Sequence, residues 1–326
     1  MPENAKHEIP IFKEEIAHKI GPSKIDIAYQ RTGREDAPAV LMIMGVAGQS
    51  IHWPESFCRD LVDRGLQLIR FDNRDSGLST YMTAAPAPDL PAVLAGDFSS
   101  VSYTLTDMAA DAKGLLDALG IVSAHVLGAS MGGQIAQVLA TDYPERVASL
   151  ISMMSTTGSR TVGHTAPKTL RELFSGPPAK TRDEFIQLYV RASRVVGSPA
   201  YPNDESEVAA TAGRAYDRGC DVVAATRQAI ATVAAGDRTE QLSKIQVPTL
   251  VIHGLADCMC DVSGGRATAE AIQGAELVLI EGMGHNLPLG LQRQLASHLA
   301  DFVWRVERGK QQSVQAVASR SVSRIH

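Results

Sequence analysis

A serine framed by glycines is the first feature of this 326-residue chain that could carry out chemistry. Gly128–Gly132 (GASMG) directly follows the apolar run Ala124–Leu127 and directly precedes a stretch of helical period, Gln134–Asp142. A Gly-x-Ser-x-Gly segment between a strand and a helix is the pattern of a nucleophile elbow, in which the serine hydroxyl projects from the carboxyl end of a sheet. The alternative is a simple glycine-rich turn. We interpret Ser130 as a nucleophile for acyl transfer, held in a strained backbone that costs about 1–3 kcal/mol.

A serine hydroxyl is a poor nucleophile at neutral pH, so a general base must accompany it. His285 follows the last strand-like run, Leu277–Ile280, and lies in the segment Gly282–Asn286, whose glycines allow a sharp turn. None of the other eight histidines is both past the final run and flanked by glycines. The alternative is an ordinary loop histidine. We predict that His285 is the base.

The carboxylate that orients the base is expected after the preceding strand, because the chain order at an elbow of this kind is serine, acid, histidine. The run Thr249–Ile252 ends at Gly254, and Asp257 lies in the next loop. From there a carboxylate can accept a hydrogen bond from Nδ1–H of the histidine, which fixes its tautomer and stabilises the imidazolium. Asp257 is the predicted acid, and Asp261 is the alternative.

Acyl transfer also needs hydrogen-bond donors for the oxyanion that develops on the substrate. The backbone N–H of Met131, which follows the nucleophile, is one expected donor. The second is expected from the turn Met44–Gly48, after the run Val40–Met44. In that turn we predict the N–H of Val46, with Ala47 as the next choice. Removing one such donor typically costs roughly 10²–10³ in rate.

Other polar segments have weaker functional interpretations. The segment Phe71–Thr80 could pass for a carboxylate pair, but a loop held by Asp and Arg hydrogen bonds is the favoured interpretation. His52–Pro54 either lines a pocket or begins a helix, with proline in its first turn. Cys258–Cys260 lacks further ligands nearby in sequence, so we predict no metal site. There is no dinucleotide fingerprint or phosphate loop, so no cofactor is expected.

The elements that must position these residues follow from the hydropathy pattern. Short runs rich in Val, Ile and Leu alternate with stretches of helical period, and runs without polar alternation indicate strands buried on both faces of a parallel sheet. Ile25–Tyr29 alternates, as an edge strand does. Tyr103–Gly120 and Leu291–Val306 are amphipathic helices, the first with a capping box at Thr104 and Asp107. The pattern predicts a three-layer α/β sandwich. The buried strands are Val40–Met44, Leu66–Phe71, Ala124–Leu127, Ala148–Met153, Thr249–Ile252 and Leu277–Ile280.

The strand–helix alternation stops between residues 155 and 242, where no strand-like run occurs. Four helical stretches follow one another there instead, and about eighty residues are too many for one crossover helix, which is the alternative. We predict a helical cap over residues 155–242, inserted after the sixth strand into a core of residues 1–154 and 243–306. Residues 307–326 are expected to be a disordered tail. The four stretches are Pro167–Phe174, Arg182–Val195, Glu205–Asp217 and Asp221–Ala235.

Composition limits the possible partners and compartments. Lys and Arg number 31 and Asp and Glu 36, a net charge of −5, which gives no general attraction for nucleic acid or acidic membranes. The four cysteines are scattered and do not form a disulfide framework. Residues 1–15 lack the apolar core of a signal peptide. The longest apolar run, Val40–Gly48, is too short to span a bilayer. We therefore expect a cytoplasmic protein without membrane or nucleic-acid partners, and the sequence indicates no oligomeric state.

These motifs together resemble the α/β-hydrolase family, over about residues 25–155 and 243–305. Met44-Gly45, Trp53-Pro54, the loop Asp72–Thr80 and the Gly128–Gly132 elbow are similar to those of the aclacinomycin methylesterase type, whose members hydrolyse a methyl ester on a polyketide glycoside. The resemblance implies the α/β-hydrolase fold, with the helical insertion as a lid that sets the shape of the substrate. It also implies a catalytic triad and oxyanion donors at the positions predicted above.

We therefore expect a serine esterase that cleaves a carboxylic ester of a small or medium apolar substrate through an acyl-enzyme, with no cofactor. Epoxide hydrolases and dehalogenases place a carboxylate at the elbow, where this chain has serine. Three alternatives stay open: a carbon–carbon bond hydrolase, an acyltransferase, and a hydrolase-fold protein that binds a ligand without turnover. In each case the partner is a small molecule.

Overall fold

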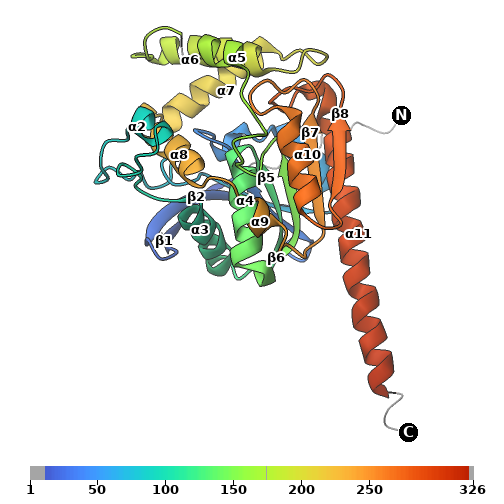
Figure 1. The fold of residues 1–326 in the computed structure, drawn as a ribbon. Coiled ribbons are helices and arrows are strands. Elements are labelled where there is room, and N and C mark those ends of the chain that lie inside the picture. The colour runs from blue at the N-terminus through green and yellow to red at the C-terminus, as the bar shows by residue number, and fades with distance from the viewer. Residues whose placement is uncertain (1–11, 174, 323–326) are drawn as a thin grey trace.

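The computed structural model describes residues 12–173 and 175–322, which form one eight-stranded sheet flanked by helices (Figure 1). The strand order is β1-β2-β4-β3-β5-β6-β7-β8. β1, β2 and β4 pair antiparallel, and every pair from β4 and β3 onward is parallel. The predicted mostly parallel sheet is confirmed. The strands are β1 Glu14–Ile20, β2 Ile25–Thr32, β3 Ala39–Ile43, β4 Gln67–Phe71, β5 Ala124–Ala129, β6 Val147–Met153, β7 Thr249–Gly254 and β8 Glu276–Ile280.

Each predicted run lies in a strand except for Met44 and Leu66, which fall one residue outside β3 and β4, but β1 has no predicted counterpart. In its sequence, EEIAHKI, only Ala17 and Ile20 are buried. Five of its seven residues therefore face away from the core, and the strand lacks the apolar run that marks the others.

Two separate cores lie on the two faces of the sheet because successive strand residues point in opposite directions. In β3, Leu41 and Ile43 pack with α3 (Leu105–Ala118) and α4 (Met131–Asp142). Val40 and Met42 pack on the other face with α1 (Glu55–Asp63) and α11 (Leu289–Val322). The three layers of the predicted sandwich are therefore present.

The helix α3 begins as its sequence predicts. Thr104 and Asp107 form the capping box, with Asp107 N–H donating to Thr104 Oγ1 at 3.2 Å and Thr104 N–H donating to Asp107 Oδ2 at 2.8 Å. Gly120, just past its end, has φ of +67°, a conformation that glycine adopts without strain.

The last helix, α11, corrects the expectation of a disordered tail. It continues past Val306 as far as Val322 and extends beyond the body of the protein (Figure 1). Glu307 fixes its middle, accepting from Lys310 one turn along the helix at 2.6 Å and lying 3.1 Å from Nε2 of His125 in β5. The predicted tail is thus helical over residues 307–322, and residues 323–326 lie outside the described residues.

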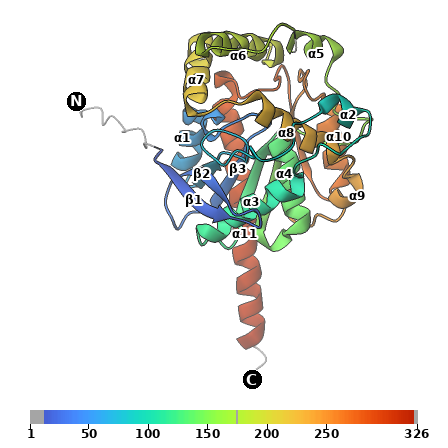
Figure 2. The same cartoon turned by 90° about the vertical axis from the view of Figure 1, so that its left-hand side faces the viewer.

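Between β6 and β7 the chain forms the predicted helical insertion. Its helices α5 and α6 lie beyond the carboxyl ends of the strands, and α7 and α8 lead back toward the sheet (Figures 1 and 2). The helix α9 contacts α4 and α10 (Val262–Ala271), so it packs with the core. All four predicted helices are present, with ends that differ by at most one residue, and Phe174 lies outside the described residues. The insertion contains α5 Pro167–Leu173, α6 Arg182–Val196, α7 Glu205–Arg218, α8 Val222–Ala234 and α9 Thr239–Leu242.

Within residues 12–173 and 175–322, no helix combines the length and the apolar composition needed to cross a membrane. The remaining short helices are α2 Leu90–Leu94, which contacts α8, and two 3₁₀ turns at Ser50–His52 and Pro144–Arg146.

Candidate active site

Ser130 occupies the sharp junction between β5 and α4. Its φ of 56° and ψ of −123° place a residue with a Cβ in a rarely populated region. A Cβ on Gly128 would stand 2.0 Å from the carbonyl oxygen of Gly132, and one on Gly132 would stand 2.0 Å from that of Ile43. Neither position can accept a side chain without backbone movement, so the glycines at both ends of the motif are required by the tight turn.

The turn of residues 44–48, in which the sequence predicts an oxyanion donor and which we call the oxyanion turn, lies beside this serine. A Cβ on Gly45 would stand 2.9 Å from Ser130 Cβ and 3.4 Å from its Oγ. The loops after β3 and β5 are neighbours because these strands pair in the sheet. The two loops are therefore in contact at this edge of the sheet.

The backbone hydrogen bonds of the oxyanion turn show which N–H groups are free. Gly48 N–H donates to Gly45 O at 3.0 Å, and Ala47 N–H donates to Gln228 Oε1 at 2.7 Å. Within the described part of the chain, the N–H groups of Val46 and Met131 have no protein acceptor. Ala47, the alternative donor, is already engaged. The sequence favours Val46 and Met131 as donors, and neither of these two N–H groups is engaged within the described residues.

His285 and Asp257 are joined by a hydrogen bond of 2.7 Å between Nδ1 and Oδ2. The Asp257 carboxylate is buried, and its Oδ1 accepts from the N–H groups of Met259 at 2.9 Å and Cys260 at 2.8 Å. Burial by itself would raise the pKa of Asp257, but the His285 imidazole, a second histidine and these backbone donors outweigh it and hold that pKa well below its ordinary value. Asp257 is therefore ionised where it meets the histidine.

Asp261, the alternative acid, has a different role. Its Oδ1 accepts from Ser263 N–H at 2.9 Å at the start of α10, and its Oδ2 accepts from His164 N–H at 2.7 Å. It is a helix cap, and among the described residues no hydrogen bond joins it to His285.

The second histidine near Asp257 is His253, at the end of β7. It is fully buried, with Nε2 at 2.8 Å from Cys260 O and at 3.5 Å from Asp257 Oδ2. These contacts hold the imidazole in a structural role at the end of the strand. They also give the carboxylate a second imidazole neighbour that the sequence did not predict.

Ser130, Asp257 and His285 follow β5, β7 and β8, whose carboxyl ends lie at one edge of the sheet because these strands run parallel. Among the described residues, no hydrogen bond joins Ser130 Oγ to His285. The carboxylate and the imidazole are thus already paired, and the hydroxyl lies at the same edge of the sheet.

The loop that carries His285 is held by the insertion. His285 N–H donates to Val196 O at 2.8 Å, and Gly284 N–H donates to Ser198 Oγ at 2.8 Å. Ser198 Oγ in turn donates to Asn286 Oδ1 at 2.6 Å. No local pattern in the sequence signals these contacts, since the partners lie almost ninety residues apart.

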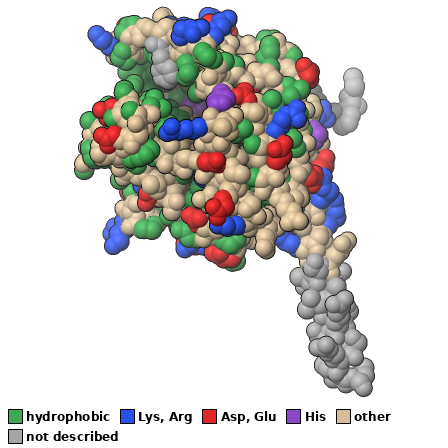
Figure 3. Space-filling view, viewed as in Figure 1, with side chains coloured by type: hydrophobic (Ala, Val, Ile, Leu, Met, Phe, Trp, Pro, Cys, Tyr) green, Lys and Arg blue, Asp and Glu red, His purple; other side chains and the backbone are tan. Residues whose placement is uncertain are grey.

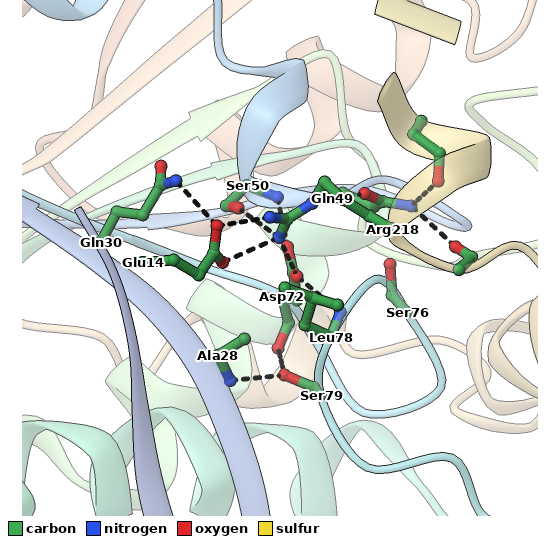
Figure 4. A network of polar contacts seen from close by, with 12 residues as sticks. Glu14, Ala28, Gln30, Gln49, Ser50, Asp72, Ser76, Leu78, Ser79 and Arg218 are labelled. Atoms are coloured by element: carbon green, nitrogen blue, oxygen red, sulfur yellow. Dashed lines mark hydrogen bonds and ion pairs between the residues drawn. The ribbon is translucent and has the colours of Figure 1, made fainter. Parts of the chain in front are cut away.

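The loop after β4 is held by ion pairs, as the sequence favours. Asp72 accepts from Ser50 N–H at 2.6 Å and Leu78 N–H at 2.9 Å, and it pairs with Arg218 of α7 at 2.5 Å. Figure 4 shows Arg218 between Asp72 and Glu14 of β1. These carboxylates are engaged in structural contacts.

The segment His52–Pro54 begins a helix. Pro54 is the N-cap of α1, and Trp53 is fully buried. His52 stacks on Tyr189 of α6 with ring centroids 5.6 Å apart, and burial lowers the pKa of His52 to about 4. Of the two interpretations, the helix start is observed, and His52 also contacts the insertion.

The cysteines and possible metal ligands show no further site. All four cysteines are free thiols. In the part of the chain that the structure describes, no group of three or more His, Cys, Asp and Glu residues is arranged to hold a metal ion.

The surface is hollowed beneath the insertion, with hydrophobic side chains in the hollow (Figure 3).

A mostly parallel sheet with a strained serine elbow at its carboxyl edge defines an α/β hydrolase, and comparison with known proteins agrees. The family model for the alpha/beta hydrolase fold matches residues 38–290, so the chain belongs to this family, as predicted.

Its relatives include ester hydrolases. Rhodomycin D methylesterase DnrP of Streptomyces peucetius is 30% identical over 284 residues, covering 80% of this chain and 89% of that protein. The putative carbamate hydrolase RutD of Pseudomonas syringae pv. syringae is 28% identical over 271 residues, covering 81% and 95%. The resemblance to methylesterases is confirmed, and the chain is a hydrolase of the carboxylic ester class.

Solved structures show the same fold. The esterase RhEst1 from Rhodococcus sp. ECU1013 aligns with a TM-score of 0.68 at 20% identity, covering 90% of this chain and 99% of that one. The enol-lactonase from Burkholderia xenovorans LB400 aligns with a TM-score of 0.64 at 21% identity, covering 89% and 99%. At these identities the likeness concerns the fold alone.

Proposed function

We propose that this protein is a serine hydrolase that cleaves a carboxylic ester of a small or medium apolar substrate through Ser130, His285 and Asp257. The observation that carries the proposal is the 2.7 Å bond between His285 and a buried, ionised Asp257, at the sheet edge where the strained serine also lies. A histidine oriented in this way is suited to accept a proton from a nucleophile.

The proposed reaction has two halves. Ser130 Oγ attacks the ester carbonyl carbon while His285 takes its proton, and the tetrahedral oxyanion accepts hydrogen bonds from the N–H groups of Val46 and Met131. His285 then protonates the leaving alcohol as the carbon–oxygen bond breaks, which leaves an acyl-enzyme. Water, deprotonated by the same imidazole, releases the acid and restores the serine. Asp257 stabilises the imidazolium in both halves.

The insertion, residues 155–242, is proposed to act as a lid that selects the substrate. Phe185 and Tyr189 of α6 and Tyr216 of α7 form an aromatic cluster, with the Phe185 and Tyr216 rings 5.6 Å apart. Together with the hydrophobic hollow in Figure 3, this cluster favours apolar acyl or alcohol groups. The methylesterase among the relatives supports an ester as the substrate class.

The test is a panel of p-nitrophenyl esters of increasing acyl length, given to the wild type and to Ser130→Ala. Turnover by the variant is expected to fall by up to roughly 10⁶-fold. Ser99→Ala, at an exposed loop serine, is the matched control and should keep full activity. A fluorophosphonate probe should label the wild type and the control, and spare Ser130→Ala. Unchanged hydrolysis by Ser130→Ala would exclude the proposal, and product analysis with an added alcohol separates hydrolysis from acyl transfer.

A further inference from the structure

We propose that Gln228, in helix α8 of the insertion, is a positioning residue that holds the oxyanion turn in its productive shape. This inference rests on the proposed function. The Gln228 side chain is fully buried. Its Oε1 accepts from Ala47 N–H at 2.7 Å, and its Nε2 donates to Arg74 O at 2.7 Å. One amide thus connects the turn after β3 with the loop after β4.

The peptide that Gln228 holds is the one most in need of support. Ala47 has φ of 58°, in the left-handed region that a residue with a Cβ occupies only at a cost. Asn73 Nδ2 donates to Met44 O at 3.0 Å, and Ser76 Oγ donates to Gly48 O at 2.8 Å, so these side chains hold the two ends of the turn. Gln228 holds the peptide between them.

The peptide next to this one carries the proposed oxyanion donor. The Ala47 N–H belongs to the Val46–Ala47 peptide, and the free N–H of Val46 belongs to the peptide before it. Fixing the Val46–Ala47 peptide therefore limits rotation of the backbone at Val46 and sets the direction of the Val46 N–H. The Gln228 side chain binds Ala47 N–H and does not itself touch the substrate oxyanion, so it acts on that oxygen only by positioning the Val46 N–H.

Gln228 can act as a rigid support because its surroundings are fixed. Arg74, whose carbonyl accepts from it, forms a buried double ion pair with Asp111 at 2.6 and 2.8 Å. Arg227, the neighbour of Gln228 in α8, pairs with Asp75 at 2.8 and 2.9 Å. Both the helix and the loop are thus held against the core on either side of the amide.

The expected kinetic signature follows from this geometry. A displaced Val46 N–H weakens stabilisation of the tetrahedral intermediates in both acylation and deacylation. Substrate binding in the ground state does not use this bond. Loss of the support should therefore lower kcat and leave KM nearly unchanged.

The experiment uses Gln228→Met, which keeps the side-chain length and removes both hydrogen bonds. We expect kcat for a p-nitrophenyl ester to fall about 10–100-fold, with KM within about twofold. Affinity for phenylboronic acid, which forms a tetrahedral adduct at the serine, should fall by a similar factor. Gln228→Glu keeps an acceptor for Ala47 N–H and should recover most of kcat.

Gln67→Met is the matched control. Gln67 is a buried glutamine of β4, 1% exposed, whose Nε2 donates to Arg34 O at 2.7 Å, so its replacement also removes a buried amide. It should lower Tm as Gln228→Met does and leave kcat unchanged. Equal kcat in the two methionine variants would overturn the inference.

If Gln228→Met does not fold, Gln228→Asn, too short to span both partners, must show the same loss of kcat. Esterase activity that persists in Ser130→Ala would refute the proposed function itself. If Ser130→Ala loses activity but Gln228→Met keeps full kcat, only the inference about Gln228 is refuted.

Discussion

Gly45 lies against Ser130 so closely that a Cβ at Gly45 would stand 2.9 Å from the Cβ of the serine. The turn that offers the Val46 N–H and the hydroxyl that would attack an ester are therefore in direct contact. Any side chain at residue 45 must displace one of them, because a distance under 3.0 Å is shorter than carbon atoms tolerate.

Gly45→Ala should thus reduce kcat/KM by about 100-fold, similar to the loss of an oxyanion donor. The rate of fluorophosphonate labelling at Ser130 should fall in parallel. Gly309→Ala, in α11, is the control, because a Cβ there meets no atom within 4 Å. It should keep full activity and gain up to about 1 kcal/mol of stability from helix propensity. Wild-type labelling by Gly45→Ala would contradict the expected displacement.

Asp257→Asn should reduce kcat by about 10⁴-fold, because an amide favours the wrong tautomer of His285. The esterase assay measures this effect directly. Asp261→Asn changes the same residue type four positions along the chain, where the side chain caps α10 and accepts from His164 N–H. That control should keep kcat and lose about 0.5 kcal/mol of stability or less. A larger activity loss in the control than in Asp257→Asn would reverse the assignment of the acid.

His125 should make the protein less stable as the pH falls from 6.5 to 4. Burial lowers the pKa of His125 to about 4, and Lys310 acts in the same direction, against Glu307. In this pH range the unfolded chain binds a proton at His125 that the folded protein does not, so the free energy of unfolding falls as the pH falls. The contribution is at most about 3 kcal/mol, at about 1.4 kcal/mol per pKa unit.

His125→Asn should flatten this dependence, as measured by urea unfolding at a series of pH values. His52, whose pKa burial also lowers to about 4, should leave a residual slope. An unchanged slope in His125→Asn would show that His125 does not titrate in this way.

Arg218→Met should destabilise the protein by about 3 kcal/mol, because it leaves Asp72 and Glu14 without their cation. The Asp72 side chain is 0% exposed and that of Arg218 is 14% exposed, so water cannot replace the pair. Arg182→Met breaks an exposed pair with Asp217 and should cost less than about 1 kcal/mol. Denaturant unfolding measures both changes, and equal losses would show that the buried pair has no special weight.

The sequence predicted those parts of the site that depend on local pattern. Ser130, Asp257 and His285 could be placed because each follows a recognisable apolar strand, and parallel strands bring their carboxyl ends to one edge. Four of the five helices of the insertion, α5 to α8, could be placed from their periodicity. β1 could not, since its exposed charged residues conceal the alternation.

The supports of the site could not be predicted from the sequence. Gln228 and Ala47 are 181 residues apart, and Ser198 and Gly284 are 86 residues apart. These pairs meet only because α8 and the segment after α6 dock on the sheet edge, and no local pattern encodes that docking.

The two attachments of the insertion bear on how the substrate range of this enzyme can be engineered. Val196 and Ser198 hold the histidine loop and Gln228 holds the turn after β3, so the insertion cannot be exchanged without losing these contacts. A chimaera that carries a relative's insertion on this sheet would gain a different pocket lining. It would also lose the hydrogen bonds to the histidine loop and to the turn after β3, unless the residues that form them are restored. Point substitutions at the aromatic side chains of α6 and α7 avoid that loss.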